Sequence, residues 1–541
     1  MLAINYPDRQ FAHRTASIVA PRDLHPLLSI EALGSTIDAA LHRFRTLFSP
    51  IRRLPNEIIS IIFLLVETEI RLAPGEATLR PRFLRDLLSV SRSWRSIAQS
   101  TPGLWTRVSI PRPSFVRVCL ENSVRAPLDI VYTAREGARP GQVGTSLGLV
   151  SAHLDRWKTC RLERVQDGEL IKYLSAPAPI LEVLHIECTS QGRADTVTGS
   201  SSSFDRLFDG QTPRLRELTL KQTFVPLTHP IYSGLTKLRL SHIVFTKSES
   251  IQLLLRALAA SPLLEELHLE NLQFLFSSAE AQAHDVSASR AELPHLVLVN
   301  VNQAHAQWAL AHLLAHIVPS PAVRLVMSAT LNDGSDDMRS VLPEWSPSPS
   351  ATSNLAHVRE LGLHSNRMNS RFVLIGEPSR STPSFHIKLQ AQKLAGRIIP
   401  HLGHVFPMRH LESVIFSSFD LSTSALADVT DFLARHPHIR EISLYDCDAK
   451  FIELLTVTPE RRMCPLLQKL SIERCHTSDA GLRRLVESRT GLERGGDIES
   501  LKHLRIPYWS TFADSTISAL RERLTVEECR VSMIKLGGAG I

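Results

Sequence analysis

The sequence predicts an α/β fold in which a small all-helical module precedes an irregular solenoid of short parallel strands that alternate with helices. Two observations predict it. A helical pattern near residue 60 has two apolar stripes, and ten copies of the pattern apolar-x-x-apolar-x-apolar follow later in the chain. The 541 residues are enough for one domain and an array. No run approaches the roughly 18 apolar residues that a membrane helix needs, so we expect no membrane partner.

Residues 1–49 are expected to form a disordered leader and an amphipathic helix. In the helix, apolar residues recur at steps of three and four: Ile30, Leu33, Ile37, Leu41, Phe44 and Leu47. This helix can form a short coiled-coil strand or pack against the next module, and its length of little more than two heptads favours packing. The start of the chain lacks a basic region followed by an apolar core, so we do not expect secretion.

Residues 50–110 contain a helix with two apolar stripes, for which Pro55 suits the first turn. The stripes consist of Ile58, Ile62 and Leu65, and of Ile59, Phe63 and Val66. One stripe can face a local core, but a module of about 50 residues is too small to cover both. An uncovered apolar patch usually marks an interface. The alternative is that the rest of the chain covers the second stripe.

Four pieces of this region resemble an F-box, as found in the large fungal (basidiomycete-type) F-box families. They are Leu54–Ile58, Ile62–Phe63, Val90–Arg95 and Thr101–Trp105, in that order and spacing. The resemblance implies a small helical unit that docks onto the SKP-type adaptor of an SCF (cullin–RING) ubiquitin ligase. The chain departs from the family pattern at Ser91, where a Cys is often found, and in a longer connector between the first two helices.

By position, the resemblance implies eight residues that contact the adaptor or support the contact. They are Leu54, Pro55, Ile58, Ile59, Ile62, Phe63, Val90 and Trp94.

Residues 111–175 are expected to be a linker with degenerate first repeats. Together with Val108–Ile110, the segments Phe115–Leu120 and Pro127–Tyr132 predict a strand, a short helix and a second strand. A further strand is expected to end near Leu162.

Residues 176–510 repeat the apolar-x-x-apolar-x-apolar pattern, interrupted by polar insertions. The copies begin at Leu181, Leu215, Leu235, Leu264, Leu293, Val358, Leu411, Ile439, Leu467 and Leu501. Neighbouring clear copies are 20 residues (Leu215 to Leu235) to 34 residues (Leu181 to Leu215) apart, and the larger gaps predict degenerate copies near Val323 and Phe385. This pattern resembles leucine-rich repeats, in which each short strand faces the interior and neighbours must stack.

The middle residue of each strand, between the two apolar positions, is expected to face outward. The candidates for target contact are therefore Thr219, Arg239, His268, Ser443, Ser471 and Arg505. The alternative is that these residues are ordinary surface. Residues 511–541 are expected to form a capping helix, over 515–528, and a tail.

The sequence predicts no catalytic residue, no cofactor and no metal site, and therefore not an enzyme. Phosphate-loop and zinc-protease motifs are absent, and the seven cysteines are scattered without a C-x-x-C pair. One Gly-x-Ser-x-Gly occurs at 144–148, but a loop-like segment precedes it where a nucleophile elbow needs an apolar strand. The pairs His401/His404 and His436/His438 have no completing ligand nearby in the sequence.

Most of the net charge of +7 lies in residues 1–110, around the helical module. Residues 1–110 hold 14 of the 61 Lys and Arg residues and 9 of the 54 Asp and Glu residues. The rest of the chain therefore has 47 basic and 45 acidic residues. A near-neutral array is not typical of nucleic-acid binding, so we expect no such partner. The cysteine usage indicates reduced thiols, and we expect a cytoplasmic and/or nuclear protein.

Together these patterns predict a substrate-recognition subunit of an SCF ubiquitin ligase, with the F-box-like module on the adaptor and the repeat array on a protein target. The mechanism is proximity, because such a receptor brings a target near a charged E2 enzyme without chemistry of its own. The alternative is a non-catalytic leucine-rich-repeat scaffold whose F-box acts outside ubiquitin transfer.

Overall fold

The computed structural model describes most of residues 50–529, and the chain divides into two compact units, Met1–Leu104 and Trp105–Ile541. The described ranges are 50–73, 76–109, 113–133, 142–165, 170–189, 204–276, 290–304, 308–320, 322–331, 337–342, 357–366, 370–377, 384–390, 395–406, 408–419, 423–491, 498–508 and 512–529. The expected leader and amphipathic helix of residues 1–49 lie outside them.

The first unit is helical where it is described. Its elements are α2 (Asn56–Leu72), α3 (Glu76–Val90) and α4 (Arg92–Gln99), with 3₁₀ turns at Pro50–Arg53 and Pro102–Leu104. Pro55 is the N-cap residue directly before α2, one residue before the first turn in which the sequence predicts it. The Ser91 side chain caps α4 by accepting a hydrogen bond from the backbone N–H of Trp94 at 3.1 Å. The apolar core of this unit comprises Ile59, Phe63, Leu84, Leu87, Ile97 and Leu104.

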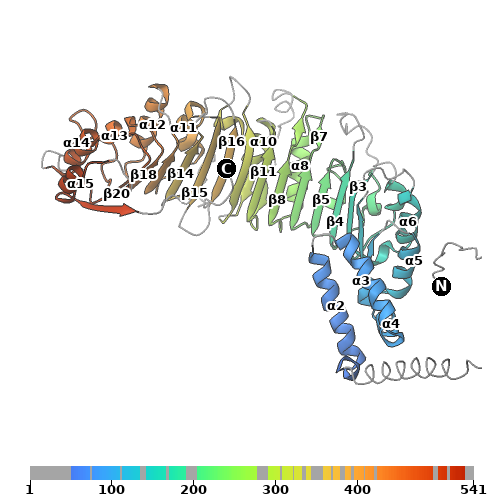
Figure 1. The fold of residues 1–541 in the computed structure, drawn as a ribbon. Helices are drawn as coiled ribbons and strands as arrows, with labels where there is room; N and C mark the ends of the chain where they lie inside the picture. The colour runs from blue at the N-terminus through green and yellow to red at the C-terminus, as the bar shows by residue number, and fades with distance from the viewer. Residues whose placement is uncertain are drawn as a thin grey trace, which may run out of the picture. The chain divides into compact units, whose positions relative to one another are not determined.

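The second unit is an α/β structure built on a 17-stranded, mostly parallel sheet (Figure 1). Its strands up to the middle of the sheet are β1 (Arg107–Ser109), β2 (Leu128–Thr133), β3 (Trp157–Val165), β4 (Val183–Cys188), β5 (Glu217–Lys221), β6 (Lys237–Ser241), β8 (Glu266–Glu270), β11 (Leu298–Gln303) and β13 (Arg324–Thr330). The others are β14 (Glu360–Ser365), β15 (Arg371–Glu377), β16 (Phe385–Gln390), β17 (Ser413–Ser417), β18 (Glu441–Tyr445), β19 (Lys469–Glu473), β20 (His503–Pro507) and β21 (Thr525–Cys529).

Helices connect many of these strands, and Figure 1 shows several of them following one another along the sheet. They are α5 (Pro113–Asn122), α6 (Gln142–Ser151), α8 (Ser250–Ala259), α10 (Trp308–Ala315), α11 (Ala395–Val405), α12 (Thr423–Arg435), α13 (Lys450–Leu455), α14 (Asp479–Thr490) and α15 (Asp514–Arg521). Two small parallel pairs accompany the main sheet: β7 (Val244–Phe245) with β9 (Gln273–Phe274), and β10 (Ala291–Leu293) with β12 (Ile317–Pro319). The α/β class and the alternation of parallel strands with helices are thereby confirmed.

The repeated apolar pattern coincides with the strands in all copies but one. In nine of the ten copies the second and third apolar residues lie buried on a strand, as Leu238 and Leu240 do on β6. The exception is the copy that begins at Leu293, where the buried strand residues are Val299 and Val301 rather than Leu296 and Leu298. Leu293 instead ends β10, which belongs to a separate two-stranded sheet, so the expected register at this copy was wrong by three residues.

The middle of the sheet departs from a simple succession of parallel strands. The predicted copies near Val323 and Phe385 are present as β13 and β16, and these two strands pair in parallel. Two antiparallel pairings, β16 with β15 and β15 with β14, follow before β14 pairs in parallel with β17. The spatial order is therefore β13–β16–β15–β14–β17, the reverse of the chain order for the three inner strands.

The end of the chain also differs from the prediction. The expected closing helix over 515–528 ends at Arg521, and Thr525–Cys529 forms β21 instead. The reason is the open edge of β20, whose residues His503–Pro507 pair in parallel with Thr525–Cys529. An unpaired strand edge carries unsatisfied N–H and C=O groups, which β21 satisfies on this side.

A recurrent turn follows several of the strands. Residues directly after several strands adopt a positive φ of about 50°, among them Gln222, His242, Asn271, Ser418 and Asp446. Each donates its backbone N–H to a carbonyl at or near the end of the neighbouring strand; for example, His242 donates to the carbonyl of Glu270 at 2.8 Å. The turn thus extends the ladder by one bond between adjacent repeats.

Arg489 on α14 is fully buried, and no acidic side chain in the described ranges forms an ion pair with it. Its guanidinium donates to the carbonyls of Leu455 at 2.7 Å, Met463 at 2.7 Å and Cys464 at 3.2 Å. Burial lowers the pKa of Arg489 to about 10, so the group is still charged at neutral pH. The side chain therefore ties the segment between α13 and β19 to α14.

Candidate protein-interaction surfaces

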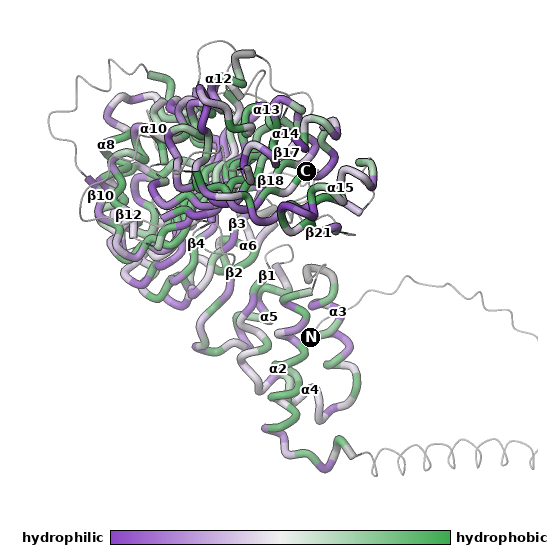
Figure 2. The backbone as a smooth tube through the Cα atoms, turned by 90° about the vertical axis from the view of Figure 1, so that its left-hand side faces the viewer, coloured by the Kyte–Doolittle hydropathy of each residue, from purple (hydrophilic) through white to green (hydrophobic). Residues whose placement is uncertain are grey.

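An apolar stripe on α2 faces solvent. Ile58, Ile61 and Leu65, at i, i+3 and i+7, are 42%, 51% and 62% exposed. Leu54 just before the helix and Val66 on it are also exposed. Figure 2 shows that much of α2 is hydrophobic along its length. Isolated exposed apolar residues are ordinary, but a stripe on one helix face is the kind of patch that protein interfaces use.

The neighbouring stripe faces the core of the unit. Ile59 and Phe63 are 5% and 3% exposed, and the Phe63 ring lies against Trp94 with 5.0 Å between ring centroids. The prediction of two stripes therefore corresponds to one buried and one exposed face. Val66 was assigned to the stripe that proves to be buried, yet it is exposed, and Glu67 occupies the buried position next to it.

The eight residues assigned to the adaptor contact divide accordingly. Leu54, Pro55, Ile58 and Val90 are exposed, Ile62 and Trp94 are half-buried, and Ile59 and Phe63 lie inside the unit. In this conformation Ile59 and Phe63 stabilise α2 rather than offer a contact surface. Ile61 and Leu65, which were not among the eight, are more exposed than Ile58.

A buried ionic cluster, which sequence reasoning missed, stabilises the same unit. The Glu67 carboxylate accepts from Arg80 Nε at 2.9 Å and from Arg71 Nε at 2.5 Å, and both Glu67 and Arg80 are only 2% exposed at the side chain. Arg80 also donates to the carbonyl of Leu104 at 2.7 Å. The signal in the sequence was an acidic residue in an apolar stripe, four residues before an arginine.

The six candidate target-binding residues all lie on one row across the sheet. The strand register places Thr219, Arg239 and His268 side by side on β5, β6 and β8, and Ser443, Ser471 and Arg505 side by side on β18, β19 and β20. The row continues between the two groups through Asn300, Val326, His386, Ile375, Gly362 and Ile415. Residues with large sequence separations therefore share one face.

Two of the six candidates are engaged within the protein. His268 is 8% exposed, and its Nε2 lies 3.0 Å from Glu266 Oε2, which also binds Lys237 Nζ at 2.6 Å. The hydrogen bonds from Lys237 and His268 lower the pKa of Glu266. Arg505 donates to Glu527 at 2.5 Å. Arg239 is exposed, whereas Thr219, Ser443 and Ser471 are half-buried.

The residues that the sequence offered for chemistry occupy structural positions. Ser146 lies buried inside α6, four residues after the helix begins, rather than on a turn between a strand and a helix. His401 Nε2 lies 3.2 Å from Asp337 Oδ2, and His436 Nδ1 lies 2.8 Å from the carbonyl of Phe432. Within the described ranges, no group of three or more His, Cys, Asp or Glu residues is arranged to hold a metal ion.

Comparison with models of known protein families and with curated proteins gives no match. Among the helices that the structure describes, none is both long and apolar enough to cross a bilayer. The described part of the chain thus offers two surfaces for a partner: the apolar stripe of α2 and the outward row of the sheet.

Proposed function

We propose that the chain is a substrate-recognition subunit of an SCF ubiquitin ligase, acting in the cytoplasm and/or nucleus. The helical unit is an F-box-like module that binds a SKP-type adaptor. The second unit is an irregular leucine-rich-repeat solenoid that binds a protein target on the outward face of its sheet. Such a receptor acts by proximity and contributes no reacting group.

The exposed apolar stripe of α2 is the observation that carries the proposal. Ile58, Ile61 and Leu65 leave apolar surface in water that a partner would cover. The stripe overlaps the segment whose sequence resembles an F-box, so two independent arguments favour the same surface. The buried Glu67–Arg80 pair and the Phe63–Trp94 contact hold α2 against α3 and α4, which presents the stripe on a fixed support.

Adaptor capture tests the proposal. We expect Ile58→Asp/Leu65→Asp to weaken binding of a purified SKP-type adaptor, because two half-exposed apolar anchors contribute roughly 1 to 1.5 kcal/mol each, or about 30- to 150-fold together. Ser96→Asp, at an exposed polar position on α4 outside the stripe, is the matched control and should bind like wild type. Circular dichroism shows whether both variants keep their helices. Equal capture by the double variant and the control would refute adaptor docking through α2.

The alternative scaffold function requires a second measurement. Deletion of residues 50–110 should raise the abundance of proteins that residues 176–510 capture, if the chain promotes their turnover. A scaffold whose F-box acts outside ubiquitin transfer would leave their abundance unchanged while it still captures them. Proximity labelling in cells with and without the deletion identifies the proteins to follow.

A further inference from the structure

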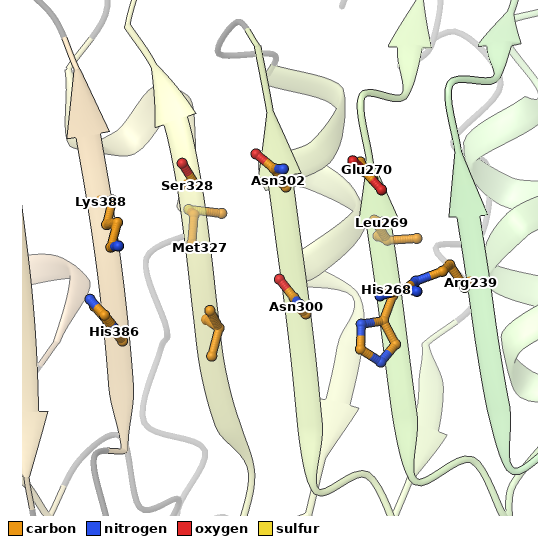
Figure 3. A pocket seen from close by; sticks show the side chains of 11 residues that line it. Arg239, His268, Leu269, Glu270, Asn300, Asn302, Met327, Ser328, His386 and Lys388 are labelled. Carbon is orange, nitrogen blue, oxygen red and sulfur yellow. The ribbon is translucent and has the colours of Figure 1, made fainter. Parts of the chain in front are cut away.

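A groove of about 500 Å³ lies on the outward face of the sheet, lined by residues of β6, β8, β11, β13 and β16 (Figure 3). Its shape follows from side-chain length. The floor carries the short side chains of Asn300, Asn302, Val326 and Ser328 on β11 and β13, whereas longer side chains on β6, β8 and β16 form the margins. At about 4.8 Å per strand, β8 and β16 are roughly 14 Å apart, which is the extent of the floor across the strands.

The floor offers hydrogen-bonding groups that the protein does not use. Asn300 and Asn302 alternate along β11 and therefore face the same side, with Asn302 exposed and Asn300 half-buried. Among the described residues, neither side-chain amide has a hydrogen-bond partner. Each amide carries two donor hydrogens and an acceptor oxygen, the set that matches the N–H and C=O groups of a peptide backbone.

The margins supply two cations without counter-ions. Arg239 on β6 and Lys388 on β16 line opposite sides of the groove, and neither makes an ion pair with any residue that the structure describes. Lys237, by contrast, pairs with Glu266 at 2.6 Å, and the carboxylate of Glu270 accepts from Ser241 at 3.2 Å. The groove thus has positive charge available at both margins.

His386 in the groove adds no charge at neutral pH. Burial lowers the pKa of His386, and the nearby Lys388 and Arg324 lower it further, so the ring is neutral. The positive character therefore comes from Arg239 and Lys388, which favour anionic groups on a ligand.

Peptide chemistry fits the groove better than nucleic acid does. Among the residues that the structure describes, no aromatic residue other than histidine lines it, so this part of the groove lacks the platforms on which bases stack. The carboxylate of Glu270 also lies at one margin and would repel a regular run of phosphates. Two cations that stand apart, with side-chain amides between them, instead suit a short peptide with a few anionic side chains.

We propose that this groove holds an extended, acidic segment of a protein target, with its backbone hydrogen-bonded to the Asn300 and Asn302 amides and its anionic side chains paired with Arg239 and Lys388. Arg239 and Lys388 stand four strand spacings apart, roughly 19 Å, which an extended segment of about six residues spans. The anionic residues are accordingly expected near the two ends of the segment. This inference rests on the proposed function, because it names the class of target for the receptor.

A peptide-library selection with the purified full-length chain tests the inference. The probes are acetylated octapeptides in three arms, in which the varied positions carry Glu, phosphoserine or Ser. We expect enrichment in the Glu or the phosphoserine arm, with anionic residues about five positions apart, and the two arms distinguish a carboxylate from a phosphoryl group. A fluorescein-labelled peptide of the enriched sequence then gives dissociation constants by anisotropy.

Variants locate the binding. Arg239→Glu/Lys388→Glu is expected to weaken the peptide at least tenfold, and Asn300→Leu/Asn302→Leu should do the same without a change of charge. Arg161→Glu is the matched control, because Arg161 is an exposed cation on the same row but on β3, outside the groove, and it should change binding less than twofold. Circular dichroism and thermal melts check that each variant is folded.

Several results would overturn the inference. They are no enrichment in either anionic arm, equal weakening by Arg161→Glu, or groove-dependent binding of a ten-nucleotide oligothymidine that competes with the peptide. Adaptor capture by the same preparations separates this inference from the proposed function. If the chain captures the adaptor but does not bind the peptide, only the proposal for the groove is refuted. If it binds the peptide but does not capture the adaptor, the SCF function is refuted and the acidic-peptide site stands.

Discussion

His364 on β14 makes the stability of the second unit sensitive to mild acid. Its side chain is 7% exposed, and the Nδ1 atom has no hydrogen-bond partner within the structure as described. Burial, and secondly the nearby His386, lower the pKa of His364 from 6.5 to about 4. The test lowers the pH from 7 to 5 and compares the resulting change in the free energy of unfolding between wild type and His364→Leu.

The magnitude follows from proton linkage. Below pH 6.5 the unfolded chain binds a proton at this histidine while the folded chain does not, so the free energy of unfolding decreases as the pH falls and levels off below about 4. For these two pKa values the loss of unfolding free energy at pH 5 is about 2 kcal/mol, and the full loss is about 3 kcal/mol, since one pKa unit corresponds to about 1.4 kcal/mol. Four other histidines, whose pKa values burial also lowers, add to the wild-type loss in the same direction: His185, His229, His386 and His436.

Urea unfolding at pH 7 and pH 5, followed by circular dichroism, measures the effect. His364→Leu should retain or slightly raise stability at pH 7, because it removes an unpartnered buried nitrogen, and should lose about 2 kcal/mol less than wild type at pH 5. His295→Leu, at an exposed position, is the control and should follow wild type. An identical pH dependence for wild type and His364→Leu would refute the assignment of this linkage to His364.

Two further substitutions probe the buried arginines. Glu67→Ala should destabilise the helical unit by about 3–5 kcal/mol in a thermal melt, because it leaves the Arg80 guanidinium buried without its carboxylate. The control Arg85→Ala removes an exposed arginine and should cost less than about 1 kcal/mol. Arg489→Leu should cost about 3 kcal/mol or more, since three buried carbonyls lose their donor at about 1 kcal/mol or more each, while the exposed Arg484→Leu should be near neutral. Unfolding midpoints that do not separate each variant from its control would contradict these roles.

Much of the repeat unit could be predicted because its signal is local. A strand with two inward-facing apolar residues and a buried corner residue recurs in the sequence as it does in space, so Leu238 and Leu240 identify β6 without any knowledge of its neighbours. The same pattern is ambiguous where apolar residues are dense. Around Leu293 and Leu296 two registers fit the sequence equally, and only the pairing of β10 with β12 decides between them.

The apolar pattern of the sequence does not predict the order or the direction of the strands in the sheet. The segment Arg371–Glu377 alternates buried and partly exposed residues like the other strands, but nothing in its sequence indicates that β15 runs antiparallel between β14 and β16. Likewise, Thr525–Cys529 continues a helical pattern in the sequence, yet the open edge of β20 makes it a strand. Long-range backbone pairing overrides local preference at such places.

For the candidate surfaces too, local sequence pattern predicts one part and long-range packing decides the other. The sequence by itself determined that the first helix has too much apolar surface for its module, and that one residue per repeat faces outward, because both follow from the periods of helix and strand. Only the tertiary structure decided that Ile58 and Leu65 are exposed while Phe63 is buried, since Arg80 on α3 and Trp94 on α4 both contact the opposite face of α2. It also decided that Arg239 and Lys388 border one groove, because 149 residues separate them in the chain and four strand pairings bring them together.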